Sequence, residues 1–102
     1  MFVIHKYRLS IGEQILPLPT SAVILTMQEQ NNQLVMWLRV PTGVVSQAMV
    51  TRTFWVAATG EDLDDTLREF DYKATAQLLN GEVYHLFEVV PRWKKYDESP
   101  AQ

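Results

Sequence analysis

Two histidines, His5 and His85, carry the side chains best suited to metal binding or to proton transfer near neutral pH. Two imidazoles and a carboxylate could hold zinc, but zinc motifs place at least two ligands at a short, fixed spacing. These histidines lie near opposite ends of the chain, and each shares a strand face with apolar neighbours. We therefore interpret both as semi-buried residues of the fold, and the sequence predicts no metal site.

A second cluster of chemistry-bearing residues is the acidic stretch that follows Gly60. It contains Glu61, Asp62, Asp64 and Asp65. Calcium loops also alternate oxygen ligands, but they need an internal glycine for the sharp turn, and here apolar residues interrupt the stretch instead. The pattern predicts a solvated turn.

No motif of covalent or phosphoryl chemistry is present. The serines lie outside any Gly-x-Ser-x-Gly context, the glycines are too far apart for a phosphate loop, and cysteine is absent. The sequence therefore predicts a protein that is not an enzyme, with no catalytic residue and no cofactor. Arg39 and Arg52, on either side of the loop Pro41–Met49, could contact a phosphate or carboxylate, or could simply solvate the end of a sheet.

Composition limits the other classes of function. The chain has 102 residues, of which 47% are hydrophobic and 21% charged, enough for one domain with one core. No apolar run is long enough to span a membrane, and the first residues do not resemble a signal peptide. The net charge of −3, with few clustered cations, argues against nucleic acid as a partner.

Glycine and proline separate short β-rich runs along the chain, which is typical of an all-β domain. The runs are Phe2–Leu9, Glu13–Leu18, Ala22–Gln28, Gln33–Val40, Val50–Thr59, Asp71–Leu79 and Glu82–Val90. We expect a small antiparallel β-sandwich or partly open barrel built from hairpins, with at most one short helix, over Asp62–Phe70. Residues 1–90 form the single domain, and residues 91–102 form a polar, loosely ordered tail.

The Asn80-Gly81 pair predicts a two-residue type I′ turn, because both residues tolerate positive φ. That turn pairs Leu79 with Glu82. It places His85 opposite Ala76 on the apolar face and Lys73 opposite Glu88 on the other face.

A second turn, at Asn31-Asn32, pairs Gln30 with Gln33 and places Met27 opposite Met36 and Leu25 opposite Leu38. Pairing Leu38 with Phe54 then extends this hairpin into a three-stranded meander with one hydrophobic face.

The other face of that meander is the candidate binding face, because it is not polar as a solvent-facing sheet usually is. Trp37 falls opposite Trp55, and Ile24, Val35 and Arg39 accompany them. Trp and Arg are enriched at interface hot spots. The face is either covered by the chain itself or binds a protein partner or a second copy in a homo-oligomer.

Several short segments form a pattern that spans most of residues 2–88. They are Ile4-His5-Lys6-Tyr7, Leu16-Pro17, Ala22-Val23-Ile24-Leu25, Gln28, Gln30, Trp37, Arg52-Thr53-Phe54, Thr59-Gly60, Thr75-Ala76-Gln77-Leu78 and His85-Leu86-Phe87-Glu88. On these segments the chain resembles a family of short, uncharacterised proteins encoded by bacteriophages and prophages. Members often continue the Thr59-Gly60 pair with a histidine, where this chain has Glu61.

The resemblance implies a phage accessory protein in the host bacterial cytoplasm, and it brings no catalytic residues. Together with the tryptophan face, it favours a non-enzymatic protein that binds a host factor and counters a defence system. Two alternatives stay open. One is a binding protein that sequesters a small anionic ligand such as a nucleotide through Arg39 and Arg52, and the other is a structural virion component.

Overall fold

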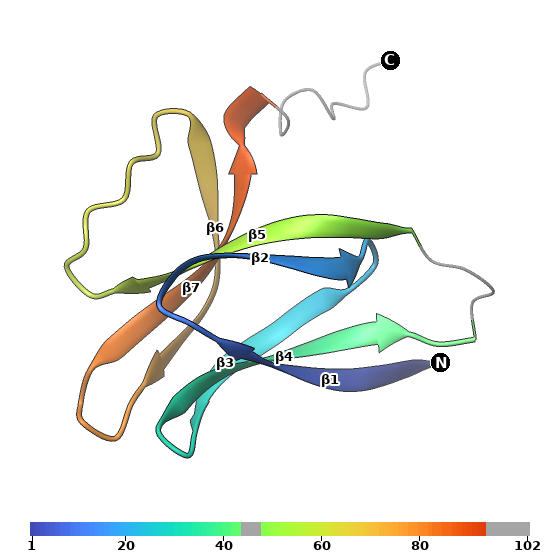
Figure 1. Cartoon of the computed structure of the whole chain (residues 1–102), viewed down its shortest axis with the longest axis horizontal. Helices are drawn as coiled ribbons and strands as arrows, with labels where there is room; N and C mark the ends of the chain where they lie inside the picture. The colour runs from blue at the N-terminus through green and yellow to red at the C-terminus, as the bar shows by residue number, and fades with distance from the viewer. Residues whose placement is uncertain (44–47, 94–102) are drawn as a thin grey trace.

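The computed structural model describes residues 1–43 and 48–93, which form two antiparallel β-sheets (Figure 1). The strands are β1 (Phe2–Leu9), β2 (Gly12–Pro19), β3 (Val23–Gln30), β4 (Gln33–Pro41), β5 (Met49–Ala58), β6 (Arg68–Gln77) and β7 (Val83–Pro91). One sheet has the order β1-β4-β3 and the other β2-β5-β7-β6. The predicted all-β fold of sandwich type is confirmed.

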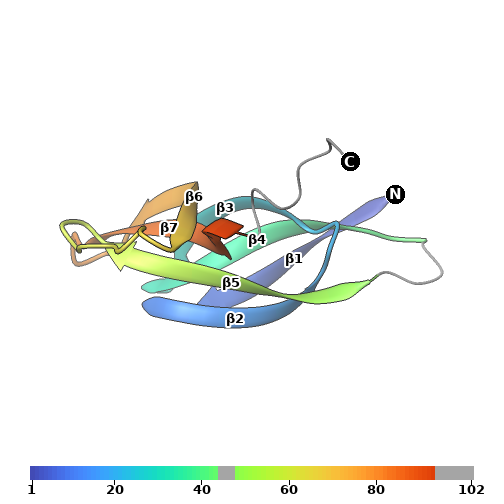
Figure 2. The same cartoon turned by 90° about the horizontal axis from the view of Figure 1, so that it is seen from above.

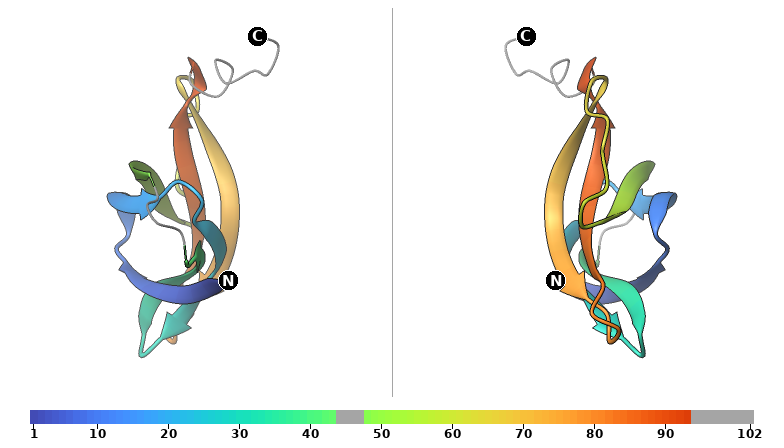
Figure 3. Two further views of the ribbon diagram at one scale, coloured as in Figure 1. Left: turned by 90° about the vertical axis from the view of Figure 1, so that its right-hand side faces the viewer. Right: turned by 90° about the vertical axis from the view of Figure 1, so that its left-hand side faces the viewer.

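The two sheets lie face to face, as the side views show (Figures 2 and 3). The chain passes from the three-stranded to the four-stranded sheet between β1 and β2, returns between β2 and β3, and crosses again between β4 and β5. At the opposite edge β3 lies beside β6, but no hydrogen-bonded ladder joins these strands within the described residues. The result is a sandwich rather than a closed barrel.

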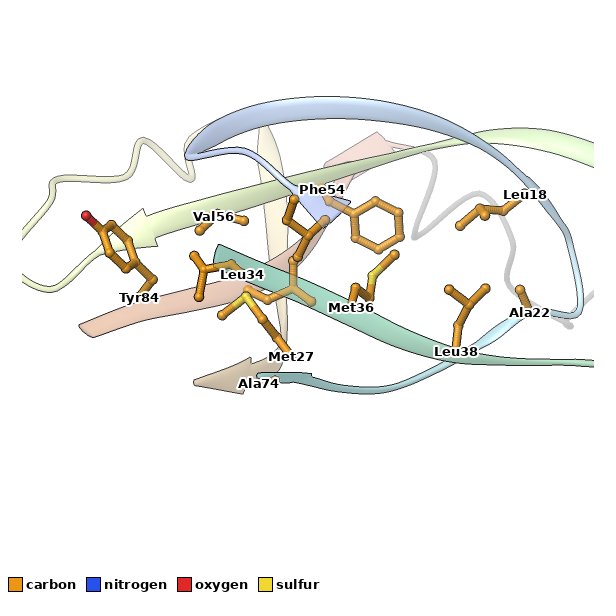
Figure 4. Packing of buried hydrophobic residues seen from close by; sticks show 12 residues of the cluster. Leu18, Ala22, Met27, Leu34, Met36, Leu38, Phe54, Val56, Ala74 and Tyr84 are labelled. Atoms are coloured by element: carbon orange, nitrogen blue, oxygen red, sulfur yellow. The ribbon is translucent and has the colours of Figure 1, made fainter. Parts of the chain in front are cut away.

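The core lies between the sheets and is built by alternate residues of central and edge strands alike (Figure 4). Met36 and Leu38 of β4 and Phe54 and Val56 of β5 are fully buried. These strands face each other across the core, so the predicted side-by-side pairing of Leu38 with Phe54 is wrong. The alternation of apolar and polar residues identifies the buried face of a strand. The pattern is the same whether a second strand is hydrogen-bonded beside the first or packs against it across the core.

The β3–β4 hairpin turns at Asn31 and Asn32, whose φ angles of 53° and 59° are those of a type I′ turn. Gln30 pairs with Gln33 and Met27 with Met36, as predicted. Beyond Thr26 a β-bulge at Leu25 shifts the register.

Because of this bulge, Ile24 rather than Leu25 lies opposite Leu38, and it packs against the core. Leu25 is 46% exposed. The bulge therefore reverses the predicted orientation of Ile24, which was placed on the binding face.

The β6–β7 hairpin has a longer turn than predicted. The Gly81 N–H donates to the Leu78 carbonyl, and the Leu78 N–H donates to the Glu82 carbonyl. Gly81 has a φ of 92°, whereas Asn80 does not have a positive φ. This is a three-residue loop closed by a glycine bulge, a geometry that an Asn-Gly pair also fits.

The extra loop residue shifts the β6–β7 register by one, which exchanges the two faces of β7 but leaves Ala74 and Ala76 of β6 on the core side. Ala76 pairs with Tyr84, and Thr75 pairs with His85. Tyr84 belongs to the core, while His85 lies on the outer face, so its predicted position on the apolar face is wrong. A second bulge, at Lys73, changes the register again along β6.

The segment Asp62–Phe70 contains no helix, because Asp62–Asp65 are irregular and β6 already starts at Arg68. The Arg92 N–H donates to the Leu67 carbonyl at 2.9 Å, just after β7 ends. Residues 94–102 of the predicted tail, and residues 44–47 of the loop Pro41–Met49, lie outside the described residues. In the part that is described, no helix is long and apolar enough to cross a membrane.

Replacing Gly81 with alanine should lower the free energy of unfolding by about 1 kcal/mol, measured by urea denaturation. A Cβ atom there would meet no other atom within 4 Å, so the cost arises from the positive φ alone. In the same turn, Leu79→Ala removes a side chain that is 77% exposed and should change stability by less than about 0.5 kcal/mol. Equal effects of the two substitutions would contradict the assigned turn.

Candidate functional site

His85 lies at the centre of a chain of hydrogen bonds on the outer face of the four-stranded sheet. Its Nε2 is 2.8 Å from the Thr59 hydroxyl, and its Nδ1 is 3.0 Å from the Thr75 hydroxyl. The Tyr72 hydroxyl lies 2.7 Å from that of Thr75. This series of hydrogen bonds links β6 and β7 to the end of β5.

The Thr59 hydroxyl next to the His85 imidazole resembles a nucleophile next to its base, but the direction of the hydrogen bonds argues against that role. The Thr59 hydroxyl also lies 3.3 Å from the Val83 carbonyl, which can only accept. A hydroxyl has one proton. If Thr59 donates it to Val83, it must accept from Nε2–H of His85, so the imidazole does not activate Thr59.

The other histidine, His5, is exposed on β1 of the three-stranded sheet, so the two histidines lie on different sheets. Among residues 1–43 and 48–93, no three His, Cys, Asp or Glu side chains are grouped so that they could hold a metal ion.

The acidic stretch after Gly60 uses its carboxylates to order its own turn. Glu61 accepts hydrogen bonds from the Trp55 indole at 3.0 Å and from the Ala58 N–H at 3.1 Å. Asp64 accepts the Thr66 N–H at 3.0 Å. Two hydrogen bonds from Thr66 lower the pKa of the Asp64 carboxyl below its usual value. The bond from the Thr66 hydroxyl has the larger effect, and the bond from the backbone N–H has the smaller one. These contacts fit the predicted turn.

Arg52 is held by an ion pair at the edge of the core. Its Nε and Nη2 each lie 2.7 Å from a carboxylate oxygen of Glu88, and its Nη1 donates to the Ala22 carbonyl at 2.6 Å. Lys73 also approaches Glu88, at 3.8 Å. The guanidinium is therefore already engaged on three nitrogens.

Arg39, the other predicted anion contact, lies on the other sheet, with its guanidinium carbon 4.0 Å from the centre of the Phe2 ring. The structure does not bring Arg39 and Arg52 together.

The two tryptophans of the predicted face also lie on different sheets. Trp37 pairs with Lys6 and Thr26 in the three-stranded sheet, while Trp55 pairs with Glu13 and Phe87 in the four-stranded sheet. The prediction that Trp37 lies opposite Trp55 required β4 and β5 to be hydrogen-bonded neighbours. It is wrong because these strands belong to different sheets.

The outer face of the four-stranded sheet carries an aromatic cluster that was not predicted from the sequence. We call it the aromatic face, and it consists of Trp55, Phe70, Tyr72 and Phe87. Successive rings meet edge to face, with centres 5.9–6.4 Å apart. Tyr72 is 61% exposed, and the other three side chains are half-buried.

Charged groups border the aromatic face. The Arg68 guanidinium lies over Trp55 and Phe70, at 5.6 and 5.3 Å from their ring centres, and pairs with Glu13 at 3.2 Å. The sequence signal for this face was present as aromatic residues on three neighbouring strands. Two features hid it: the wrong hairpin register put Phe87 in the core, and the bulge at Lys73, which turns Tyr72 outward, was not predicted.

Three of the five residues of the predicted binding face lie on the outer face of the three-stranded sheet, namely Val35, Trp37 and Arg39. We call this outer face the basic face and define it by Phe2, Lys6, Arg8, Trp37 and Arg39. The Lys6 ammonium lies 5.6 Å from the centre of the Trp37 ring and donates to Gln30 at 2.7 Å. The Trp37 indole N–H is buried and has no acceptor among the described residues.

Glu88→Ala should lower the free energy of unfolding by about 3 kcal/mol, because it leaves the Arg52 charge, only 15% exposed, without its partner. Glu13→Ala breaks the more exposed pair with Arg68 and should cost less than about 1 kcal/mol. Thermal or urea denaturation of both variants measures the difference. A cost below 1 kcal/mol for Glu88→Ala would show that Arg52 does not depend on this pair.

Comparison with known proteins gives one informative result. Neither the curated proteins nor the solved structures provide a match. A family model described as a domain of unknown function, DUF7352, matches residues 1–95. Because this match covers nearly the whole chain, including every strand, the protein belongs to the DUF7352 family.

Proposed function

We propose that the chain is a non-enzymatic binding protein that recognises another protein through the aromatic face. The observation that carries this proposal is the position of the aromatic cluster on the outside of the four-stranded sheet. The outer face of an antiparallel sheet is usually polar, because it contacts water. Four aromatic rings across β5, β6 and β7 are explained by a surface that becomes buried on binding.

The layout of the face matches that of protein interfaces, which have an apolar centre and a polar rim. Trp55, Phe70 and Phe87 form the centre, and Tyr72 presents a ring with a hydroxyl to solvent. Ile15, on the neighbouring strand β2, is 59% exposed and extends the apolar surface. Since Trp and Tyr are the most frequent hot-spot residues, Trp55 and Tyr72 are the expected anchors.

The roles of the ionisable groups also support binding over catalysis. His85 joins strands, Glu61 orders a turn, and Arg52 closes the edge of the core. With Arg52 engaged by Glu88, the small-ligand alternative loses one of its two proposed phosphate contacts.

The finer part of the proposal is the nature of the partner. The resemblance to phage and prophage proteins supports a partner in the host bacterial cytoplasm, and we propose a host defence factor that this protein inhibits.

Binding should depend on Trp55 and Tyr72. Tagged wild-type protein, and the variant Leu25→Ala/Leu79→Ala, should retain the same host protein from a bacterial extract, whereas Trp55→Ala/Tyr72→Ala should not. Titration of the purified partner should then show at least a 30-fold weaker affinity for the aromatic-face variant, because the loss of even one hot spot costs about 2 kcal/mol.

The control variant removes exposed apolar side chains outside the aromatic face, and thermal denaturation of all three proteins verifies that each is folded. Equal affinity of the aromatic-face variant and the wild type would overturn the proposal. So would a wild-type dimer that Trp55→Ala/Tyr72→Ala converts to a monomer, because the occupant would then be a second copy of this chain.

A further inference from the structure

The positive charges of the molecule are distributed unevenly. Of nine Lys and Arg residues, Lys94 and Lys95 lie outside the described part, which leaves seven. Four of these are in ion pairs: Arg52, Arg68, Lys73 and Arg92. The other three, Lys6, Arg8 and Arg39, make no ion pair with a described carboxylate, and all three belong to the basic face.

The strand register gathers these three cations on one surface. Lys6 pairs with Trp37 and Ile4 with Arg39 across β1 and β4, so alternate residues of both strands point outward together. Lys6 and Arg8 are two residues apart on an extended strand, about 7 Å along it. The third strand adds Thr26, Gln28 and Gln30, so no carboxylate lies on this face of the described sheet.

Aromatic rings lie between the cations. Phe2 is 53% exposed beneath the Arg39 guanidinium, and Trp37 is partly exposed beside the Lys6 ammonium. The basic face therefore offers charge and stacking surface.

This combination fits a flexible anionic chain that carries flat apolar groups. Proteins that bind single-stranded nucleic acid join a positive surface, which follows the phosphates, to aromatic or guanidinium planes on which bases stack. An acidic protein segment would use the charges but has no regular need for the rings. A duplex cannot stack its bases on Phe2 or Trp37, because they are already stacked on each other.

The net charge of −3 does not argue against binding of a single strand, because the acidic groups with known partners lie away from the basic face. Glu13, Glu69 and Glu88 are in ion pairs of the four-stranded sheet, and Glu61 and Asp64 order the loop before β6. Packed sheets lie about 10 Å apart, which is about one Debye length at 0.1 M salt. We therefore propose that the basic face binds single-stranded DNA or RNA, independently of the aromatic face.

The test is fluorescence anisotropy with a labelled 20-nucleotide single strand, titrated with the full chain between 50 and 200 mM salt. Three phosphate contacts predict a slope of log affinity against log salt of about −2, a loss of about 20-fold over this range. In Lys6→Gln/Arg8→Gln the slope should fall to about −0.7. Trp37→Leu should weaken binding about fivefold or more with the salt slope unchanged.

The matched control, Lys73→Gln/Arg92→Gln, removes the same charge from the other sheet and should bind like the wild type. Equal losses in both double variants would overturn the proposal, because binding would then follow net charge alone. Equal affinity for a duplex of the same sequence would also overturn it. Competition by poly-glutamate as effective as that by the unlabelled strand would assign the face to acidic protein segments instead. Thermal denaturation shows whether each variant is folded.

Discussion

Burial of one face of each sheet in a shared core is the constraint on which the rest of this structure depends. Met36 and Leu38 of β4 pack opposite Phe54 and Val56 of β5. Since side chains alternate along a strand, this core fixes which residues point outward from both sheets. The aromatic and basic faces are the outward halves of the strands that build the core, and neither can change register without disrupting it.

Much of the fold could be predicted from local patterns. The β-rich runs match the strands within a few residues, and the Asn31-Asn32 turn has the expected geometry, because both asparagines adopt the positive φ that a type I′ turn requires. The Asn80-Gly81 turn differs because only Gly81 adopts a positive φ there. A turn longer by one residue exchanges the faces of one strand of a hairpin relative to the other, and dipeptide preference does not distinguish the two loops.

The candidate sites were less predictable, because they depend on which strands are neighbours. Alternation correctly grouped Val35, Trp37 and Arg39, which lie on one strand. It could not place Trp55 on the other sheet, since the sheet partner of β5 is set by tertiary packing. Ile24 was misplaced by the bulge at Leu25, which no turn or composition signal announces.

The two bulges have a consequence for the behaviour of the protein at high concentration. They lie at Leu25 on β3 and at Lys73 on β6, the edge strands that lie beside each other. Bulges twist a strand and interrupt its ladder, and neighbouring edges shield each other from foreign strands. The remaining edges carry other deterrents to intermolecular strand addition, namely the prolines of β2 and the cations of β1. Each edge of the described sheets thus carries a feature that opposes edge-to-edge aggregation, although the outer faces carry several aromatic residues.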